Sequence, residues 1–259
     1  MNSEIINISW WNVAITTIMV IAAGICSLYL KLRLERDILV GTIRTFIQLF
    51  LLGYILKYVF SLNSPFFILI LFMFMIYNAI SIISGRVQEK RIPYFLPVLI
   101  TMVLSYMIIN TFVMSMIIQV KPWYNPIYFI PIGGMIIGNS MNALAISISI
   151  WFESVKKERD RIELYLSLGA NHVESSSENF KYSIKAGMIP SINALMSVGV
   201  VSIPGMMTGQ ILAGTDPLIA IKYQIVIMLL LVGSTALTTV FAMQIVRWLS
   251  FTSSRQLKI

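Results

Sequence analysis

Residues 65–84 read PFFILILFMFMIYNAISIIS, a run that contains no charged side chain. An α-helix needs about 20 predominantly apolar residues to cross the hydrocarbon core of a bilayer. This stretch therefore predicts a membrane-spanning helix. Comparable apolar runs precede and follow it along most of the chain.

Composition and the other apolar runs extend this prediction to the whole chain. Of the 259 residues, 58% are hydrophobic and 12% charged, whereas about 25% are charged in a typical soluble domain. We expect an all-α polytopic membrane protein that forms a single transmembrane domain over residues 1–259. Its seven predicted spans are Trp10–Leu30, Ile38–Phe60, Pro65–Ser84, Phe95–Ile118, Ile127–Trp151, Met188–Leu212 and Leu218–Val246.

The basic residues predict the orientation of these spans. With seven spans, fifteen of the nineteen Lys and Arg residues fall on one side of the membrane and three on the other, while Arg44 lies inside a span. The side richer in basic residues is usually cytoplasmic. We therefore expect the N-terminus outside and the C-terminus in the cytoplasm. The net charge of +8 then reflects topology and does not indicate nucleic-acid binding.

One cytoplasmic segment, residues 152–187, is too long to be a simple turn. It holds six of the eleven acidic residues, but 36 residues are too few for a core of their own. Good helix formers run from Glu153 to Leu168; Gly169 then suits a helix C-terminus and Asn171 a following N-cap. A solvated loop is the simplest reading, but loops of this length are uncommon without a function. We expect a helical docking element.

Several chemistries are disfavoured. No acidic residue lies in a predicted span, and the only histidine, His172, lies in the cytoplasmic segment. Ion-coupled carriers and intramembrane proteases usually need such groups within the membrane. No glycine is followed by lysine, so the chain has no P-loop. We expect a protein that is not an enzyme, and any ATP must be bound by another polypeptide.

Small residues interrupt two of the spans. Gly134 and Gly138 form one Gly-x-x-x-Gly motif and Gly205 and Gly209 another; such motifs let two helix backbones approach closely in lipid. Pro204 precedes the second motif and removes a backbone donor. We expect these five residues to provide helix packing and, at Pro204–Gly205, a hinge.

Amides in the spans are candidates for a translocation pathway. Asn139 and Asn142 share one helical face, as do Met206 and Gln210. Buried amides in lipid need partners, which are either another helix or a solute. Both alternatives stay open for each pair.

Arg44 and Gln48, one helical turn apart, form a further candidate pair. Arg44 lies about 9 Å along its predicted span from the cytoplasmic side. A side chain of this length can extend to the lipid headgroups. Anchoring at the headgroups is therefore the alternative to a pathway role.

The order and spacing of several segments carry a resemblance. From about Asp37 to Met228 they include GTIRTFIQLFLLGYIL, KPWYNPIYFIPIGGMIIGNSMNA and AGMIPSINALMSVGVVSIPGMMTGQILAGTDP. Together they resemble the Fet-type iron-export permease family of ABC transporters, to which plant aluminium-tolerance permeases are related. The block Ser202–Pro217 is the most specific part of the resemblance.

The resemblance implies a multi-pass permease of the cell membrane, in bacteria the plasma membrane, that exports iron or a related metal. Two permease chains would work as a homodimer with two copies of an ABC ATPase subunit. ATP and Mg would be bound by that ATPase, and no cofactor by this chain. An ATP-independent channel or facilitator, a scaffold without transport activity, and a permease for a non-metal solute such as a glycoconjugate are the alternatives.

The resemblance also implies a coupling element in the cytoplasmic segment. ABC permeases dock on their ATPases through a Glu-Ala-Ala-x-x-x-Gly element, and here Leu164 and Tyr165 replace the two alanines. The Ile-x-Leu-Pro ending of importers is missing as well. The implied coupling residues are Glu163, Leu168, Gly169 and Ala170.

In the block Ser202–Pro217, an alternating-access permease would use Pro204 with Gly205 as its hinge. Its cavity would be lined by Met206, Met207, Thr208 and Gln210. Thioethers suit Cu(I) better than Fe²⁺, so the methionines either bind metal or fill space around a moving helix. The metal ligands therefore stay unassigned.

Overall fold

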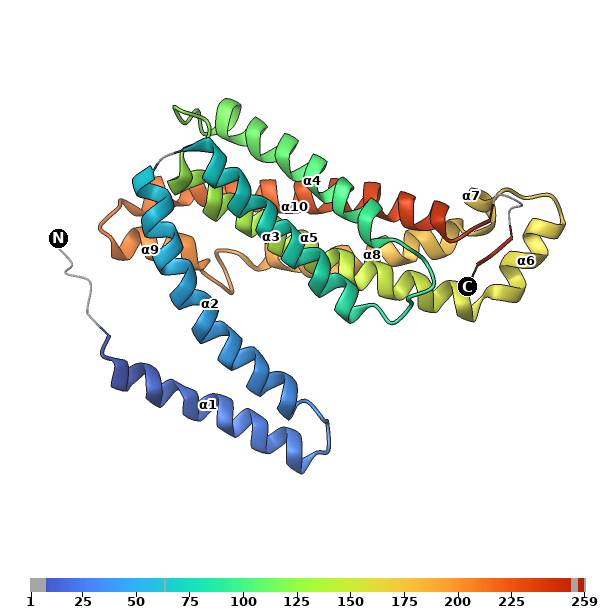
Figure 1. The fold of residues 1–259 in the computed structure, drawn as a ribbon, viewed down its shortest axis with the longest axis horizontal. Helices are drawn as coiled ribbons and strands as arrows, with labels where there is room; N and C mark the ends of the chain where they lie inside the picture. Colours follow the sequence, from blue (N-terminus) through green and yellow to red (C-terminus); the bar gives the residue numbers. More distant parts are fainter. Residues whose placement is uncertain (1–7, 63, 253–255, 259) are drawn as a thin grey trace. The chain divides into compact units, whose positions relative to one another are not determined.

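The computed structural model describes residues 8–62, 64–252 and 256–258. Figure 1 shows that helices dominate the described chain. Together with the apolar runs, they confirm an all-α polytopic membrane protein. In chain order, with η1 a π-helical turn, the elements are α1 (Trp10–Tyr29), α2 (Glu35–Leu62), α3 (Pro65–Arg86), α4 (Phe95–Phe112), η1 (Val113–Ile117), α5 (Pro126–Lys157), α6 (Arg159–Ser167), α7 (His172–Ser175), α8 (Ser177–Ser197), α9 (Gly205–Leu212) and α10 (Pro217–Leu249).

The chain forms two compact units, and the first is built on α1 and α2. These helices make a hairpin whose turn is closed by Ser27: its Oγ donates to Glu35 Oε2 at 3.0 Å and accepts from the Leu34 amide at 3.0 Å. Nearly all apolar side chains of the hairpin are exposed. Such an apolar exterior is expected of helices surrounded by lipid.

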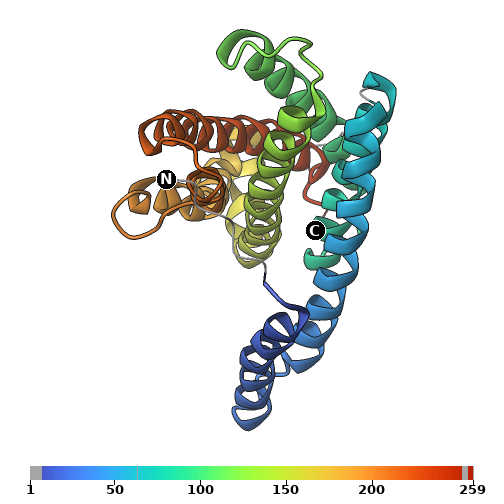
Figure 2. The same cartoon turned by 90° about the vertical axis from the view of Figure 1, so that its left-hand side faces the viewer.

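The second unit holds α3 to α8, α9 up to Ile211, and α10. Its central helix is α5, which packs against α3, α4, α8 and α10 (Figure 2). Asn125 caps the start of α5 by accepting from the Ile127 amide at 3.1 Å, and Pro126 occupies the first turn, where a missing amide hydrogen costs nothing. The buried face of α5 includes Ile136, Leu144 and Trp151.

One end of this bundle brings together three segments that the charge pattern predicts to be cytoplasmic. Trp151 Nε1 donates to Ser250 Oγ at 3.0 Å, which joins the ends of α5 and α10. The rings of Tyr94 and Phe152 lie 5.9 Å apart and place the α3–α4 connection at the same end. In Figure 1, α6 and α7 also lie at this end, opposite to α9.

The number of continuous spans differs from the prediction. Six of the described helices are long and apolar enough to cross a membrane, namely α1, α2, α3, α4 with η1, α5 and α10. The predicted span Met188–Leu212 is wrong as a single helix, because α8 ends at Ser197 and α9 begins at Gly205. Together, α8 and α9 still lead from the α6–α7 end of the bundle to the start of α10 (Figure 1).

The break has a local cause. Pro204 donates no hydrogen bond, and its ring would clash with the carbonyl of Val200 in a continuous helix. Gly199 takes a φ of +83°, a left-handed conformation that side chains disfavour. Its amide donates to Ser202 O at 2.9 Å and forms a tight turn before α9 starts. Pro190, by contrast, remains inside α8.

The predicted orientation can be tested with single cysteines in a Cys26→Ser background. We expect a membrane-impermeant thiol reagent applied to intact cells to label position 216 but neither position 163 nor position 258. Position 2, also predicted to be outside, precedes the described residues. External labelling at position 163 would contradict both the orientation and a cytoplasmic docking element.

Candidate functional site

The segment α6–α7 has the local structure that the sequence predicts. Helix α6 ends before Gly169, whose φ is +97°. Asn171 then caps α7: its Oδ1 accepts from the Glu174 amide at 2.9 Å, while Glu174 Oε2 accepts from the Asn171 amide at 2.8 Å. This reciprocal capping box fixes the chain direction after the glycine. The predicted helix end and N-cap are confirmed.

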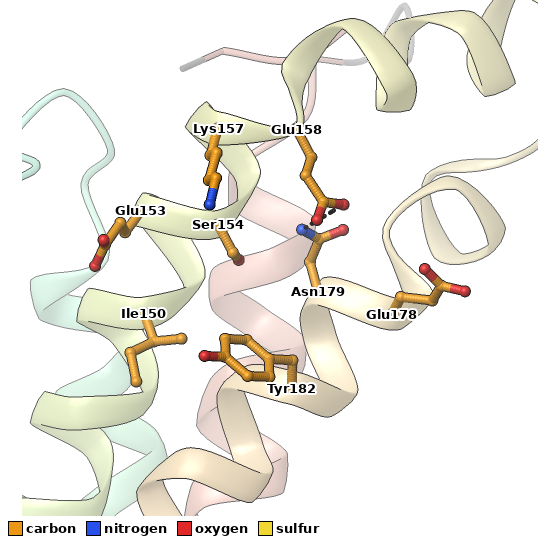
Figure 3. A pocket seen from close by; sticks show the side chains of 8 residues that line it. All are labelled: Ile150, Glu153, Ser154, Lys157, Glu158, Glu178, Asn179 and Tyr182. Carbon is orange, nitrogen blue, oxygen red and sulfur yellow. Dashed lines mark hydrogen bonds between the residues drawn. The ribbon is translucent and has the colours of Figure 1, made fainter.

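Side chains tie this segment to the bundle (Figure 3). Arg161 pairs with Glu158 at 3.2 Å and with Glu178 at the start of α8. Asn179 Nδ2 also donates to Glu158 Oε2 at 3.3 Å. The hydrogen bond that Arg161 donates to the Glu178 carboxylate raises the pKa of Arg161, aided by Tyr165, so this cation stays charged at physiological pH. Residues of α5, α6 and α8 thus form one connected end.

Beneath these exposed charges lies an aromatic layer. Trp151 is fully buried and meets Phe180 of α8 edge-on, with ring centroids 6.3 Å apart. The guanidinium of Arg247 lies over the Phe180 ring at 4.0 Å, a distance at which cation–π attraction is favourable. His172 lies beside Phe251, with ring centroids 5.7 Å apart. This layer joins α5, α7, α8 and α10.

A pocket of about 440 Å³ opens between the ends of α5 and α8 (Figure 3). Three carboxylates and one ammonium group contribute to its lining. Among the residues that the structure describes, no group of His, Cys, Asp or Glu is arranged to hold a metal ion. The three carboxylates make the pocket complementary to a basic or polar group. Its lining residues are Ile150, Glu153, Ser154, Lys157, Glu158, Glu178, Asn179 and Tyr182.

Apolar side chains are exposed on the same segment. Leu168 is 75% exposed, Leu164 56% and Val173 41%. Glu163 forms an exposed ion pair with Arg159 at 2.7 Å, and Ala170 donates its amide to Tyr165 O. These exposed apolar side chains are therefore candidates for a contact with another protein. Three of the four predicted coupling residues, Glu163, Leu168 and Gly169, are thus accessible.

The candidate pathway residues lie on three helices, α2, α5 and α9. Arg44 and Gln48 are exposed on α2, in the first unit. Asn139 donates to Met135 O of its own helix at 3.0 Å, whereas Asn142 Oδ1 accepts from Arg86 at 3.2 Å near the end of α3. The remaining three are partly buried on α9, where one of them lines a cavity: Met206, Met207 and Gln210.

The glycines in close helix contacts are not those of the predicted motifs. A Cβ placed on Gly187 of α8 would lie 2.0 Å from Ser147 Oγ and 2.5 Å from Ala143 O, so α5 and α8 approach closely there. A Cβ on Gly133 would lie 2.4 Å from the Phe72 ring.

The glycines of the predicted motifs have more space within one chain. A Cβ on Gly134 would meet only Met75 Cε, at 3.0 Å, and one on Gly138, Gly205 or Gly209 would meet no atom within 4 Å. Packing of the Gly205–Gly209 pair against a second chain stays a prediction.

A buried polar seam runs between α4, α5 and α10, and the sequence reading missed it. Ser140 and Thr235 lie 3.4 Å apart, and Ser140 faces the Tyr106 hydroxyl without reaching hydrogen-bond geometry. Thr238 and Thr239 continue the seam along α10, and their hydroxyls are buried with no partner among the described residues. The spacing i, i+3, i+4 of these three threonines was an available signal, because it places them on one helical face. The seam offers neutral oxygen atoms.

With this geometry established, comparison with known proteins decides the family. The profile described as "Uncharacterised protein family (UPF0014)" matches residues 10–251. The chain belongs to the UPF0014 family. The match includes the α6–α7 segment, the helix break and the polar seam of this UPF0014 protein.

Its relatives include bacterial and plant members. The protein named probable iron export permease protein FetB of Escherichia coli strain K12 is 34% identical over 260 residues, which cover 100% of this chain and 98% of the relative. UPF0014 membrane protein YjkA of Bacillus subtilis strain 168 is 32% identical, with 95% and 97% covered. Protein ALUMINUM SENSITIVE 3 of Arabidopsis thaliana is 28% identical, with 95% and 88% covered. No solved structure matches this UPF0014 chain. The relatives' names and the six apolar helices together identify a multi-pass membrane permease.

Proposed function

We propose that this chain is the membrane permease subunit of an ABC exporter, driven by ATP hydrolysis on a separate subunit. The observation that carries the proposal is the α6–α7 segment, which exposes leucines at the end of the bundle where the basic loops gather. A permease of this kind performs no covalent chemistry. ATP and Mg belong to the partner, and two copies of this chain form the transport unit.

The contacts of this segment support force transfer from the partner. A displacement of α6 acts on α8 through Arg161 and Glu178, and on the end of α5 through Glu158. Helix α8 leads directly into the break after Ser197. Movement of the docking segment is therefore transmitted along α8 to the break between α8 and α9, where helical hydrogen bonds are interrupted. The break is the hinge of the proposed transport cycle.

For the transported species we propose iron or a related metal, on the basis of the name of the E. coli relative. The described residues contain no cluster of carboxylate, imidazole or thiolate ligands. A metal would then pass neutral oxygen and thioether groups, which hold Fe²⁺ weakly. Weak contacts suit a transport pathway, since a tightly bound ion leaves slowly.

The polar seam favours a second candidate substrate. Hydroxyl groups such as those of Ser140, Thr235 and Thr238 form hydrogen bonds with a neutral polar molecule as readily as with a hydrated ion. A glycoconjugate, which carries many hydroxyl groups, would be bound without any charged partner. An ATP-independent facilitator would use the same seam but would not need the docking segment.

Reconstitution with the partner ATPase separates these functions. We expect an ABC ATPase to be encoded beside this gene and to co-purify with the chain, and Fe²⁺ supplied to proteoliposomes on the side of the ATPase and ATP to stimulate ATP hydrolysis severalfold. An ATPase that cannot hydrolyse ATP is the matched control. Stimulation by a glycoconjugate but not by Fe²⁺ would identify the glycoconjugate as the substrate. Solute flux without ATP would contradict the assignment as an ABC exporter.

A further inference from the structure

A second pocket, of about 370 Å³, lies beside the helix break. Its walls come from the end of α8, the turn at Gly199, Pro204, Met207 of α9 and the first turns of α10. Almost all of its lining is apolar; Leu195 and Met228 are typical. An apolar cavity of this size accommodates a small ligand.

Gln224 is the exception among the lining residues. Its side chain is only 6% exposed, and its Oε1 is buried with no hydrogen-bond partner among the described residues. A buried amide oxygen without a hydrogen-bond partner destabilises the fold, so a ligand that supplies a donor gains affinity there. Rotation of the amide exchanges its oxygen and nitrogen atoms, so the group can offer either an acceptor or a donor to the pocket.

The mouth of the pocket is apolar as well. Ile203, Ile225 and Leu229 line the pocket and are 65%, 54% and 60% exposed. Gln224 lies seven residues after Pro217, about 10 Å along α10 from its start at 1.5 Å per residue. At this depth the surroundings of a membrane helix are lipid. A ligand therefore enters sideways from the bilayer.

We propose that this pocket binds an amphiphile from the membrane: an apolar chain that carries one hydroxyl group, with the chain in the cavity and the hydroxyl on Gln224. A hydroxyl group both donates and accepts, so it satisfies the amide in either orientation. Two sources share this chemistry, namely a membrane lipid with a hydroxyl-bearing headgroup and a free hydrophobic alcohol. The inference goes beyond the proposed function and does not depend on what the chain exports.

Binding would act on the hinge, because the ligand contacts both sides of the break. Leu195 precedes the turn, Gly199 lies in it, and Met207 follows it. A molecule wedged among them holds the ends of α8 and α9 in the arrangement seen here. Occupancy of the pocket is thereby linked to the conformation of the hinge.

The test uses the full-length chain, purified in detergent, and a diazirine-bearing octanol as photolabel. We expect saturable labelling that unlabelled octanol displaces and that maps to peptides of the pocket. Gln224→Leu should weaken the apparent affinity about fivefold, the effect of losing one hydrogen bond. The matched control is Gln244→Leu, the same change at an exposed site on α10, which should label like the wild type.

A second variant, a second photolabel and a measurement in nanodiscs separate loss of binding from a folding defect. Leu195→Trp fills the pocket and should abolish saturable labelling, while a diazirine-bearing octane, which lacks the hydroxyl, should bind wild type and Gln224→Leu equally. If a lipid is the natural occupant, octanol labelling disappears in nanodiscs of phosphatidylethanolamine and phosphatidylglycerol. If a free alcohol is the occupant, labelling persists there.

Three outcomes would overturn the proposal. They are labelling that does not saturate, labelling that maps elsewhere, and equal affinity of octanol for wild type and Gln224→Leu. A second copy of the chain could instead cover the pocket. In that case labelling would be absent, and two Val200→Cys chains, in the Cys26→Ser background, would form a disulfide with each other.

Discussion

Valine in place of Gly169 abolishes the stimulation of ATP hydrolysis by the transported solute, while the chain still inserts into the membrane; this is the expected result with the largest effect on function. The φ of +97° at Gly169 lies in the left-handed region, where a β-branched side chain is strained. The strain of about 1–3 kcal/mol is relieved by distorting the turn between α6 and α7. The measurement is solute-stimulated ATPase activity of the reconstituted complex.

Two companion variants separate strain from loss of contact. Gly169→Asn should retain most of the stimulation, because asparagine tolerates left-handed conformations better than other residues that have a side chain. Leu168→Asp introduces no strain at a side chain that is 75% exposed, yet it should reduce stimulation by removing an apolar contact with the partner. Stimulation of wild-type size in Gly169→Val would place the ATPase contact elsewhere on the chain.

Gly187→Ala should clearly destabilise the chain. The new Cβ would lie 2.5 Å from the carbonyl oxygen of Ala143, a backbone atom that cannot turn aside, and 2.0 Å from Ser147 Oγ. Overpacking of this kind costs about 1–3 kcal/mol, more than the roughly 1 kcal/mol that alanine gains over glycine in a helix. A clearly lower melting temperature of the detergent-solubilised chain is expected.

Gly138→Ala is the matched control, since its Cβ would meet no atom within 4 Å. It should melt at or slightly above the wild-type temperature. The double variant Gly187→Ala/Ser147→Ala should recover part of the loss, because the contact with Oγ disappears while the carbonyl contact remains. Wild-type melting of Gly187→Ala would show that α5 and α8 are further apart in the membrane.

The sequence predicts features that depend on nearest neighbours along the chain. The apolar runs locate six membrane-spanning helices, and Gly169 with Asn171 locates the turn between α6 and α7, because capping and left-handed backbone are decided within four residues. The proline at 204 signals an interruption but not its extent. The helix ends seven residues earlier, at Ser197, because Gly199 makes a turn whose hydrogen bonds appear only in the folded chain.

Contacts between distant segments could not be predicted in the same way. Gly-x-x-x-Gly spacing marks helices that can approach closely, yet among the described glycines the tightest surroundings are those of Gly133 and Gly187, which belong to no such pair. Serine and threonine in apolar spans usually bond to their own helix, so a seam such as Ser140–Thr235 emerges only when α5 and α10 pack together. Gln224 likewise looks like any polar residue of a span in the sequence, and only the folded chain places it in a cavity beside the turn at Gly199.

The close contact of α5 and α8 at Gly187 lies near the middle of α5, so it can act as a pivot for this helix. From Ala143, which touches Gly187, the helix extends about 21 Å to Lys157 and about 25 Å to Pro126, at 1.5 Å per residue. A rotation of about 10° about this pivot moves both ends by roughly 4 Å in opposite directions. If α5 moves as one rigid body, a sideways displacement of its Lys157 end is matched by an opposite displacement of similar size at its Pro126 end.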